Sequence, residues 1–452
     1  MSEKPNLDTS FVWYADLERA RSELSKVSGS FCLAKWLQVT LHLHKGTTHS
    51  CHHPPTHPIL PTDIADNPSG LHNTAEKMEQ RKALLAGERP KPCEYCWNIE
   101  TQNAAAVSDR IMKSSQYWAY PFANDVVASG TGKTINPRYV EVSFSHVCNF
   151  KCSYCSADYS SKWQSELAQY GPYTSGNGGQ WSPVIEEEQN IYIEAFWKWW
   201  PTLKNDLRVF RITGGEPLLS KNTWKFLEKL EEDSLPELQL AINSNLGTST
   251  ELIEKLVSKV RNLLDKGKIS GIQIYTSIDS FGEDAELIRN GLNCELFFKH
   301  VEILLSEIPQ LQITIMATYS TLSVFRYTDL LKKVFEIRKR YINPSRRKPL
   351  GINTSYLRYP EHLSVKALNQ HLIRFPQESL DFMSLHPYDE VNYPEGFTEY
   401  EVNSMKNLID FFNMPIEDHR KQYLREHLTI FFSEHDARRG TSSTELVKRA
   451  LE

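Results

Sequence analysis

Three cysteines lie within eight positions of the sequence, in the stretch "FSHVCNFKCSYCSADY" of residues 144–159. They are Cys148, Cys152 and Cys155, and thiols at such spacing can form a disulfide, bind a metal or act as nucleophiles. A structural zinc ion is normally coordinated by four protein ligands, whereas an iron–sulfur cluster can have one iron without a protein ligand. A short loop with three thiols therefore favours a cluster, and zinc with His146 as its fourth ligand is the alternative.

The composition indicates the compartment in which these thiols work. The chain has 452 residues and eight cysteines, with no hydrophobic leader and no apolar run long enough to span a membrane. We therefore expect a cytoplasmic protein without membrane contact, in which clustered cysteines are metal ligands or catalysts and not disulfides. The formal net charge of −5 argues against a broad basic surface, so nucleic acid is not an expected partner.

The pattern of the chain predicts three regions. Residues 1–135 contain four cysteines and many histidines, residues 136–360 alternate β-rich runs with helical stretches, and residues 361–452 are helical and polar. A repeated strand–helix–strand order predicts an α/β fold with a parallel sheet, either open or closed into part of a barrel. The predicted strands are residues 138–146, 207–213, 238–244, 271–279, 311–319 and 351–359.

A second motif stands at the end of the second predicted strand, "RITGGEPLLS". The carboxyl ends of parallel strands are where functional residues gather. Gly214 and Gly215 would let a ligand approach the backbone closely, and Glu216 offers an acceptor for an ammonium group. Alone this motif predicts no more than a turn. Its place on the strand after the three-cysteine loop makes it specific.

Together these two motifs resemble the radical S-adenosylmethionine (radical SAM) superfamily, through "CNFKCSYC" and "GGEP". The resemblance implies a partial (β/α)6 barrel similar to a TIM barrel. It also implies that Cys148, Cys152 and Cys155 ligate a [4Fe–4S] cluster whose fourth iron chelates the amino and carboxylate groups of S-adenosylmethionine. The residues implied to contact that cofactor are Tyr154 near the adenine and Gly214, Gly215 and Glu216 at the methionine amine.

Polar residues at later strand ends are further candidates for binding S-adenosylmethionine. "AINSNLG" places Asn243, Ser244 and Asn245 after the third strand, and "YTSIDSF" places Ser277 and Asp279 after the fourth. This stretch resembles the "S-I-D-G" of SPASM and twitch relatives, with serine in place of the usual glycine. Ser277 and Arg289 are candidates for the ribose hydroxyls and the carboxylate. Asp279 is either a ligand-binding residue or the cap of the next helix.

Four further cysteines precede the predicted barrel: Cys32, Cys51, Cys93 and Cys96. The C-x2-C pair is typical of metal binding in a reduced compartment, and four thiolates suffice to close one site. Structural zinc and an auxiliary [4Fe–4S] cluster are both open. The chain resembles twitch-domain radical SAM proteins, which carry one auxiliary cluster, although their auxiliary cysteines follow the barrel. We therefore expect an N-terminal, twitch-like auxiliary-cluster region and a helical C-terminal extension.

The resemblance implies an oxidoreductase-type enzyme that cleaves S-adenosylmethionine to a 5′-deoxyadenosyl radical and abstracts hydrogen from a substrate C–H bond. We expect net oxidation or crosslinking of a peptide, with a reductant such as flavodoxin or ferredoxin and a precursor peptide as partners. One alternative is a dehydrogenase or epimerase of a sugar or aminocyclitol, for which Cys294 is a candidate hydrogen donor. The other is a non-catalytic iron–sulfur protein, against which "GGEP" argues.

Overall fold

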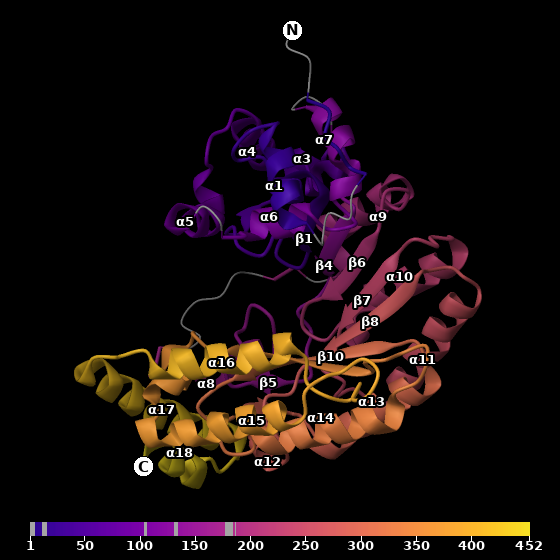
Figure 1. Ribbon diagram of the computed structural model, residues 1–452. Helices are drawn as coiled ribbons and strands as arrows, with labels where there is room; N and C mark the ends of the chain where they lie inside the picture. The colour runs from indigo at the N-terminus through magenta and orange to yellow at the C-terminus, as the bar shows by residue number, and fades with distance from the viewer. Residues whose placement is uncertain (1–4, 11–15, 104–105, 131–133, 177–183, 186) are drawn as a thin grey trace.

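The computed structural model describes residues 5–10, 16–103, 106–130, 134–176, 184–185 and 187–452 (Figure 1). Within these residues a nine-stranded sheet forms the centre of the molecule, in the order β11-β10-β8-β7-β6-β4-β1-β2-β3. Its strands are β1 (Gln38–His42), β2 (Thr47–His49), β3 (His57–Pro58), β4 (Tyr139–Ser143), β6 (Val209–Thr213), β7 (Gln239–Asn243), β8 (Gly271–Thr276), β10 (Gln312–Tyr319) and β11 (Leu350–Tyr356).

The six strands from β4 to β11 confirm the predicted α/β fold. Each lies within or overlaps one of the predicted runs, and neighbouring strands pair in parallel in their order along the chain. That sequential order is the one expected of a partial (β/α)6 barrel. The helices between the strands include α9 (Ile191–Leu203), α10 (Lys221–Glu232), α11 (Thr250–Asp265), α13 (Cys294–Glu307) and α14 (Tyr327–Tyr341).

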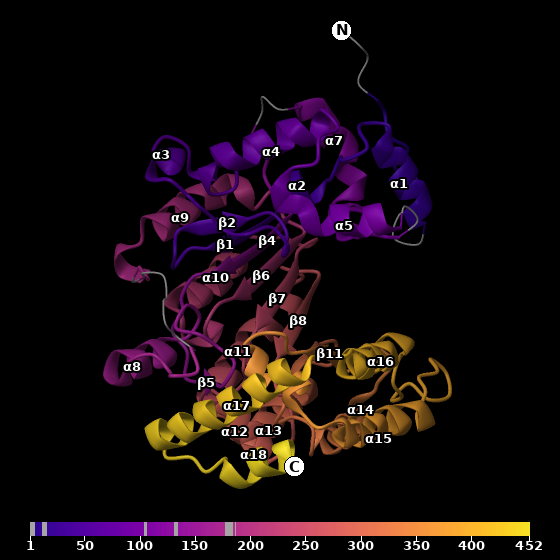
Figure 2. The ribbon, with the colours of Figure 1, turned by 90° about the vertical axis from the view of Figure 1, so that its left-hand side faces the viewer.

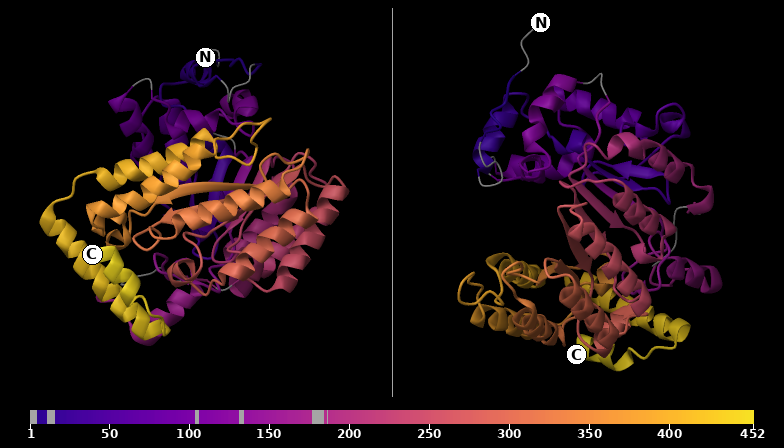
Figure 3. Two further views of the ribbon diagram at one scale, coloured as in Figure 1. Left: turned by 60° about the horizontal axis from the view of Figure 1, so that its bottom comes forward. Right: turned by 90° about the vertical axis from the view of Figure 1, so that its right-hand side faces the viewer.

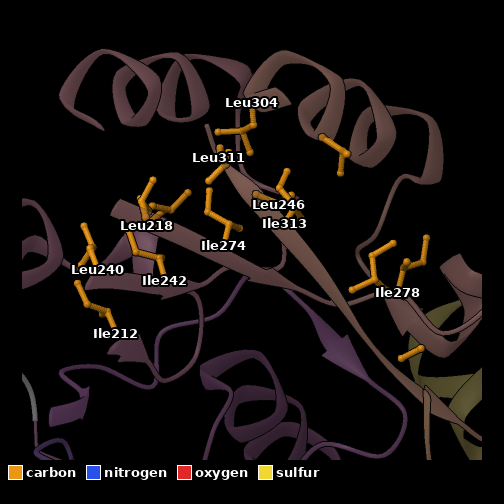
Figure 4. Close-up of a cluster of buried hydrophobic side chains, with 14 of the residues drawn as sticks. Ile212, Leu218, Leu240, Ile242, Leu246, Ile274, Ile278, Leu304, Leu311 and Ile313 are labelled. Carbon is orange, nitrogen blue, oxygen red and sulfur yellow. The ribbon is translucent and has the colours of Figure 1, made fainter. Parts of the chain in front are cut away.

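The two faces of this sheet differ in chemistry, because side chains alternate along a strand. One face is apolar and packs against the connecting helices, which lie along the outside of the sheet (Figure 3). Ile212, Ile242, Ile274 and Ile313 come from four strands and belong to the same core cluster as Leu304 of α13 (Figure 4). The opposite face carries the paired polar residues Thr40, Glu141 and Arg211, and Gln273 of β8 lies in the same row beyond Ala241 of β7. A polar face of this kind is available for a ligand.

The N-terminal part of the chain continues the sheet. β1 pairs in parallel with β4, and β2 and β3 follow as antiparallel strands (Figure 2). Val39 and Leu41 alternate with polar residues in "LQVTLH", which is a strand pattern, but this stretch was not among the six predicted strands. Around these strands lie α1 (Leu17–Ser25), α2 (Ala34–Leu37), α3 (Pro61–Ile64), α4 (Ala75–Leu85), α5 (Glu94–Gln102), α6 (Asp109–Ser114) and α7 (Ala123–Ser129).

The C-terminal region is helical, as predicted. Its helices are α15 (Arg374–Leu385), α16 (Glu399–Asn413), α17 (Asp418–Arg439) and α18 (Thr444–Leu451). α17 packs through Leu428 and Phe431 against Trp163 and Tyr173, which lie in and just after α8 (Ser161–Tyr170). This contact brings the end of the chain to the segment that follows the three-cysteine loop. Within the described residues, none of the helices combines the length and apolar character that crossing a membrane requires.

Candidate functional site

The three-cysteine loop follows β4 directly and ends at α8, so it lies at the carboxyl edge of the sheet. Its middle forms β5 (Lys151–Cys152), which pairs antiparallel with β9 (Arg289–Asn290). The Ser160 hydroxyl, which also caps α8, donates a hydrogen bond of 2.7 Å to the Phe150 carbonyl. The ring of Phe150 lies where a side chain at Gly247 would have to be, 2.1 Å from its ideal Cβ position. The loop is therefore held from both sides.

Two of the three thiols of this loop, those of Cys148 and Cys152, accept hydrogen bonds from N–H donors. The Phe150 N–H donates to Cys148 Sγ at 3.4 Å, and Arg289 Nη1 donates to Cys152 Sγ at 3.7 Å. Burial raises the pKa of Cys148 and of Cys155 to about 12, and the neighbouring Cys152 adds to both shifts. A metal cluster binds thiolates, and N–H donors to sulfur are among the features that tune one. The chemistry of this loop therefore fits an iron–sulfur cluster.

Gly214 and Gly215 permit a close approach, and the neighbour that approaches is the three-cysteine loop. A Cβ at Gly214 would lie 2.5 Å from the Ser145 carbonyl oxygen, and one at Gly215 would lie 2.3 Å from that of Val147. Gly214 also has a φ of +124°, which L residues rarely adopt. The segment that carries the two glycines is also hydrogen-bonded to this loop, since the Glu216 N–H donates to the Val147 carbonyl at 2.8 Å. The two motifs therefore form one unit.

Glu216 is buried at the centre of this unit. Its carboxylate accepts hydrogen bonds from the Asn245 N–H at 2.7 Å, the Ser244 hydroxyl at 2.8 Å and the Leu218 N–H at 3.0 Å. Burial raises its pKa to about 7, although these three donors act in the opposite direction. A cation beside Glu216 would complete its environment, because a buried carboxylate is stabilised by opposite charge.

The raised pKa predicts how pH affects stability. Protonated Glu216 is favoured in the folded protein, so its stabilising contribution is present below pH 4.5 and is lost as the pH rises toward 7. The two pKa values differ by an amount equivalent to about 3 kcal/mol of unfolding free energy. We expect the urea midpoint of the cluster-loaded protein to fall between about pH 5 and about pH 8 more steeply than that of Glu216→Gln. Parallel profiles for the two proteins would contradict this.

Tyr154, Asp279 and Arg289 form a buried network behind Cys152. Arg289 makes two bonds to the Asp279 carboxylate, Nε to Oδ2 at 2.7 Å and Nη2 to Oδ1 at 3.0 Å. The Tyr154 hydroxyl donates to Asp279 at 2.8 Å, and the Thr318 N–H donates at 2.7 Å. The cap of α12 (Glu283–Ile288) is Gly282, so the alternative that Asp279 caps this helix is wrong. Asp279 instead holds Arg289 beside the thiol.

The other predicted residues lie apart from this network. Asn243 ends β7 and accepts a hydrogen bond from Arg211 Nε at 2.9 Å, and Ser277 is half-buried just past β8. Cys294 starts α13, and its Sγ accepts a hydrogen bond from the Gly282 N–H at 3.3 Å. It lies in the core cluster and lines a cavity among α12, α13 and α14, on the helix-covered side of the sheet.

The four N-terminal cysteines converge, although 64 residues separate the first from the last in the sequence. Cys32, Cys51, Cys93 and Cys96 line one small cavity of about 20 Å³, together with cationic side chains that include Lys35, Arg110 and Lys113. In the part of the chain that the structure describes, no three His, Cys, Asp or Glu side chains are arranged to hold a single metal ion. Four thiols among cations are a donor set that fits an anionic, thiolate-bound group.

Buried polar atoms without hydrogen-bond partners lie on the polar face of the sheet. Among the described residues they include Gln38 Oε1, Thr40 Oγ1 and His42 Nδ1 on β1 and Glu141 Oε2 on β4. Arg211, whose Nε lies 3.8 Å from Glu141 Oε2, also lines a pocket of about 470 Å³ that extends across β8, β10 and β11. Unpartnered buried polar atoms call for water or a ligand. The face is therefore a candidate substrate surface.

Glu141 and Arg211 were not predicted from the sequence as functional residues. A signal for both exists, because Glu141 in "VEVSF" and Arg211 in "VFRIT" are charged residues inside otherwise apolar strands. Charges at such positions point away from the helix-covered face. Asn245 had a sequence signal in its place after the third predicted strand, but its bonds to Glu216 and Cys148 depend on the contact between two loops.

Comparison with known proteins identifies the domain that carries this site. Residues 142–320 match the sequence model of the radical SAM superfamily. The chain thus contains a radical SAM superfamily domain, which is an enzyme domain, and the superfamily implies a [4Fe–4S] cluster and S-adenosylmethionine as cofactors.

Curated relatives align over parts of the same region. GTP 3′,8-cyclase from Nautilia profundicola is 30 % identical over 120 residues, 26 % of this chain and 30 % of its own length. The Sulfurovum enzyme of that name is 27 % identical over 29 % of this chain and 33 % of its own length. A probable GTP 3′,8-cyclase from Methanocaldococcus jannaschii is 24 % identical over 34 % and 44 %. The chain thus spans less than half the length of these relatives.

Among solved structures, anSMEcpe with bound AdoMet is similar with a TM-score of 0.37 and 17 % identity, over 57 % of this chain and 64 % of that one. SuiB from Streptococcus suis bound to S-adenosylmethionine has a TM-score of 0.36 and 13 % identity, over 78 % and 70 %. Whole-chain likenesses at these scores are weak.

Proposed function

We propose that this protein is a radical SAM enzyme that generates a 5′-deoxyadenosyl radical and abstracts hydrogen from a substrate bound at the polar face of the sheet. The observation that carries the proposal is the position of Asn245. Its N–H donates to Glu216 at 2.7 Å, and its Nδ2 donates to Cys148 Sγ at 3.9 Å. Asn245 thus links the buried carboxylate of Glu216 to the thiol of Cys148. A site that binds the amino-acid part of S-adenosylmethionine beside a cluster needs these two groups close together.

The roles of the site residues follow from this arrangement. Cys148, Cys152 and Cys155 would hold the [4Fe–4S] cluster, which when bound supplies the electron that cleaves S-adenosylmethionine. Glu216 would accept the ammonium group of S-adenosylmethionine, and Gly214 and Gly215 keep that carboxylate against the loop. The proposal assigns contacts with S-adenosylmethionine to Tyr154, Asn243, Ser277 and Arg289, and assigns to Asp279 the positioning of Arg289.

The substrate we propose is a peptide side chain, oxidised or crosslinked within a precursor peptide. A second candidate is a small polar molecule, because the polar face offers Glu141, Arg211 and a pocket of about 470 Å³, a size that suits one. The curated relatives carry the name of an enzyme whose substrate is such a molecule, GTP. Genes for a short peptide beside the gene for this protein would favour the first candidate.

We propose further that Cys32, Cys51, Cys93 and Cys96 hold an auxiliary [4Fe–4S] cluster. Hydrogen abstraction leaves a substrate radical, which must lose one electron and one proton to complete a net two-electron oxidation. The four-cysteine site would receive that electron, and all four thiols are available to close the site. A reductant such as flavodoxin or ferredoxin would supply the electron for the cleavage of S-adenosylmethionine.

The test of the proposed function is the formation of 5′-deoxyadenosine and methionine from S-adenosylmethionine by the anaerobically reconstituted, dithionite-reduced protein. The variants Cys93→Ala and Cys96→Ala distinguish the contribution of the N-terminal site from that of the three-cysteine site. We expect each variant to lose about four of about eight irons and to retain cleavage of S-adenosylmethionine, because cleavage needs only the first cluster. Iron near four in the unmodified protein, with one equivalent of zinc, would show that the N-terminal site is structural.

A further inference from the structure

Three basic side chains are buried in the N-terminal region, which is unusual for lysine and arginine. Lys35, Lys77 and Arg81 are 2 %, 0 % and 1 % exposed, and Lys35 itself lines the cavity with the four cysteines. Buried lysines are rare unless a counter-charge accompanies them. Some group near these side chains must therefore balance their positive charge.

The hydrogen bonds of the two lysines go to neutral acceptors. Lys35 Nζ donates to Gln80 Oε1 at 2.6 Å, and Lys77 Nζ donates to Thr48 Oγ1 at 3.1 Å. Among the described residues, neither ammonium group lies within 4.0 Å of a carboxylate oxygen. Burial lowers the pKa of Lys77 well below its usual value, and Arg81 and Lys35 lower it further. Glu76 acts in the opposite direction on the pKa of Lys77, and so does Cys51 when its thiol is ionised.

Two carboxylates at or near the cavity, Asp109 and Glu100, are already paired with other basic groups. Asp109, which lines the cavity, lies 2.7 Å from His53 Nε2 and 3.4 Å from Lys113 Nζ. Glu100 Oε1 lies 3.0 Å from Arg110 Nε. The described protein groups around the cavity therefore leave an excess of positive charge, which ionised cysteines would balance.

We propose that Lys35 and Lys77 are the counter-charges of the iron–sulfur cluster bound by the four N-terminal cysteines, and that they raise its reduction potential. This inference rests on the auxiliary cluster of the proposed function. Four thiolates make an oxidised [4Fe–4S] cluster doubly negative, and reduction adds one further negative charge. Buried cations therefore stabilise the reduced form more than the oxidised form, because charges interact strongly away from water.

The consequence for function concerns the direction of electron flow. A raised potential makes the site a better acceptor of the electron that a substrate radical loses. Arg81 adds to the same field, but it also donates to the Lys35 carbonyl at 3.1 Å and to Asn73 Oδ1 at 2.7 Å, so its replacement would disturb the backbone. The two lysines, which each make one side-chain hydrogen bond among the described residues, are the informative positions.

The test uses full-length, reconstituted protein in which Cys148, Cys152 and Cys155 are replaced with alanine, so that only the N-terminal cluster gives a signal. Lys77→Met and Lys35→Met are each introduced into this protein, and the cluster is titrated with dithionite while its electron paramagnetic resonance signal is followed. We expect the ratio of reduced to oxidised cluster at a fixed potential to fall about tenfold, which is a shift of about 59 mV to more negative potential for a one-electron couple. Lys82→Met, exposed on the same helix α4, is the matched control and should leave the titration unchanged.

The outcomes separate the inference from the proposal on which it rests. A protein that binds zinc or no metal at the N-terminal site refutes the auxiliary cluster itself. A protein that binds a cluster whose potential is the same in both lysine variants and in the control refutes the counter-charge role. Iron content, measured for every variant, shows whether a changed signal comes from potential or from loss of the cluster.

Discussion

Alanine at Cys148, Cys152 and Cys155 together should abolish the cleavage of S-adenosylmethionine. The three thiols come from one loop that is fixed by β5, Ser160 and Phe150, and no other cysteine lies on this loop. Without them the protein has no site for the cluster that delivers the electron. We expect 5′-deoxyadenosine to fall to the level of a sample without protein, and iron to fall from about eight to about four per chain.

Cys294→Ala is the matched control for this experiment. Cys294 is buried at the start of α13 and lies outside both cysteine sets. Its replacement should leave both iron content and cleavage unchanged. Cleavage that survives in the triple variant, or that is lost in Cys294→Ala, would overturn the assignment of the three thiols.

The fold of the central region could be predicted from the sequence because its strands and helices have local signals. Runs such as "LQLAINS" are apolar and bounded by turns, and α11 places Ile253, Leu256, Val257, Val260 and Leu263 on one face. The pairing of β1 with β4 had no such signal. Nearly one hundred residues separate the two strands, and the alternating pattern of a strand does not determine which other strand it pairs with.

The candidate site shows the same division between local and long-range information. Spacing and residue type pointed to the three thiols and to Glu216, and these do lie in adjoining loops. The four N-terminal cysteines also lie together, but their wide spacing left that convergence open. The burial of Lys77 had no signal in the sequence, because a lysine on a helix is normally solvated, whereas here Lys77 is buried and donates to Thr48 of β2.

The glycines illustrate how a motif can be recognised for an incomplete reason. We expected Gly214 and Gly215 to make room for a ligand. In the structure the space that a Cβ would need is occupied by the backbone carbonyls of Ser145 and Val147. The same absence of side chains that suits a ligand-binding turn is here required by the contact between two loops. Sequence reasoning finds the glycine but does not identify the neighbour.

The second large effect concerns stability and lies in the pairing of Asp279 with Arg289. Asp279 is fully buried and accepts bonds from Arg289, Tyr154 and Thr318. We expect Asp279→Ala to lower the free energy of unfolding by about 3–5 kcal/mol, because it leaves the Arg289 guanidinium buried without its counter-charge. Urea unfolding of the cluster-loaded variant measures this loss. The same protein should lose iron more readily, since Arg289 also donates to Cys152 Sγ.

The surface pair Arg261–Glu307 provides the comparison that tests the reason for this loss. Its two atoms lie 2.9 Å apart, but both side chains are about half exposed, so Glu307→Ala should cost less than about 1 kcal/mol. Adding Arg289→Met to Asp279→Ala should restore part of the stability, because the unpaired charge is then absent. A double variant that is destabilised by the sum of the two single losses would show that the two residues act independently, and that the network behind Cys152 is not held together by its charge pair.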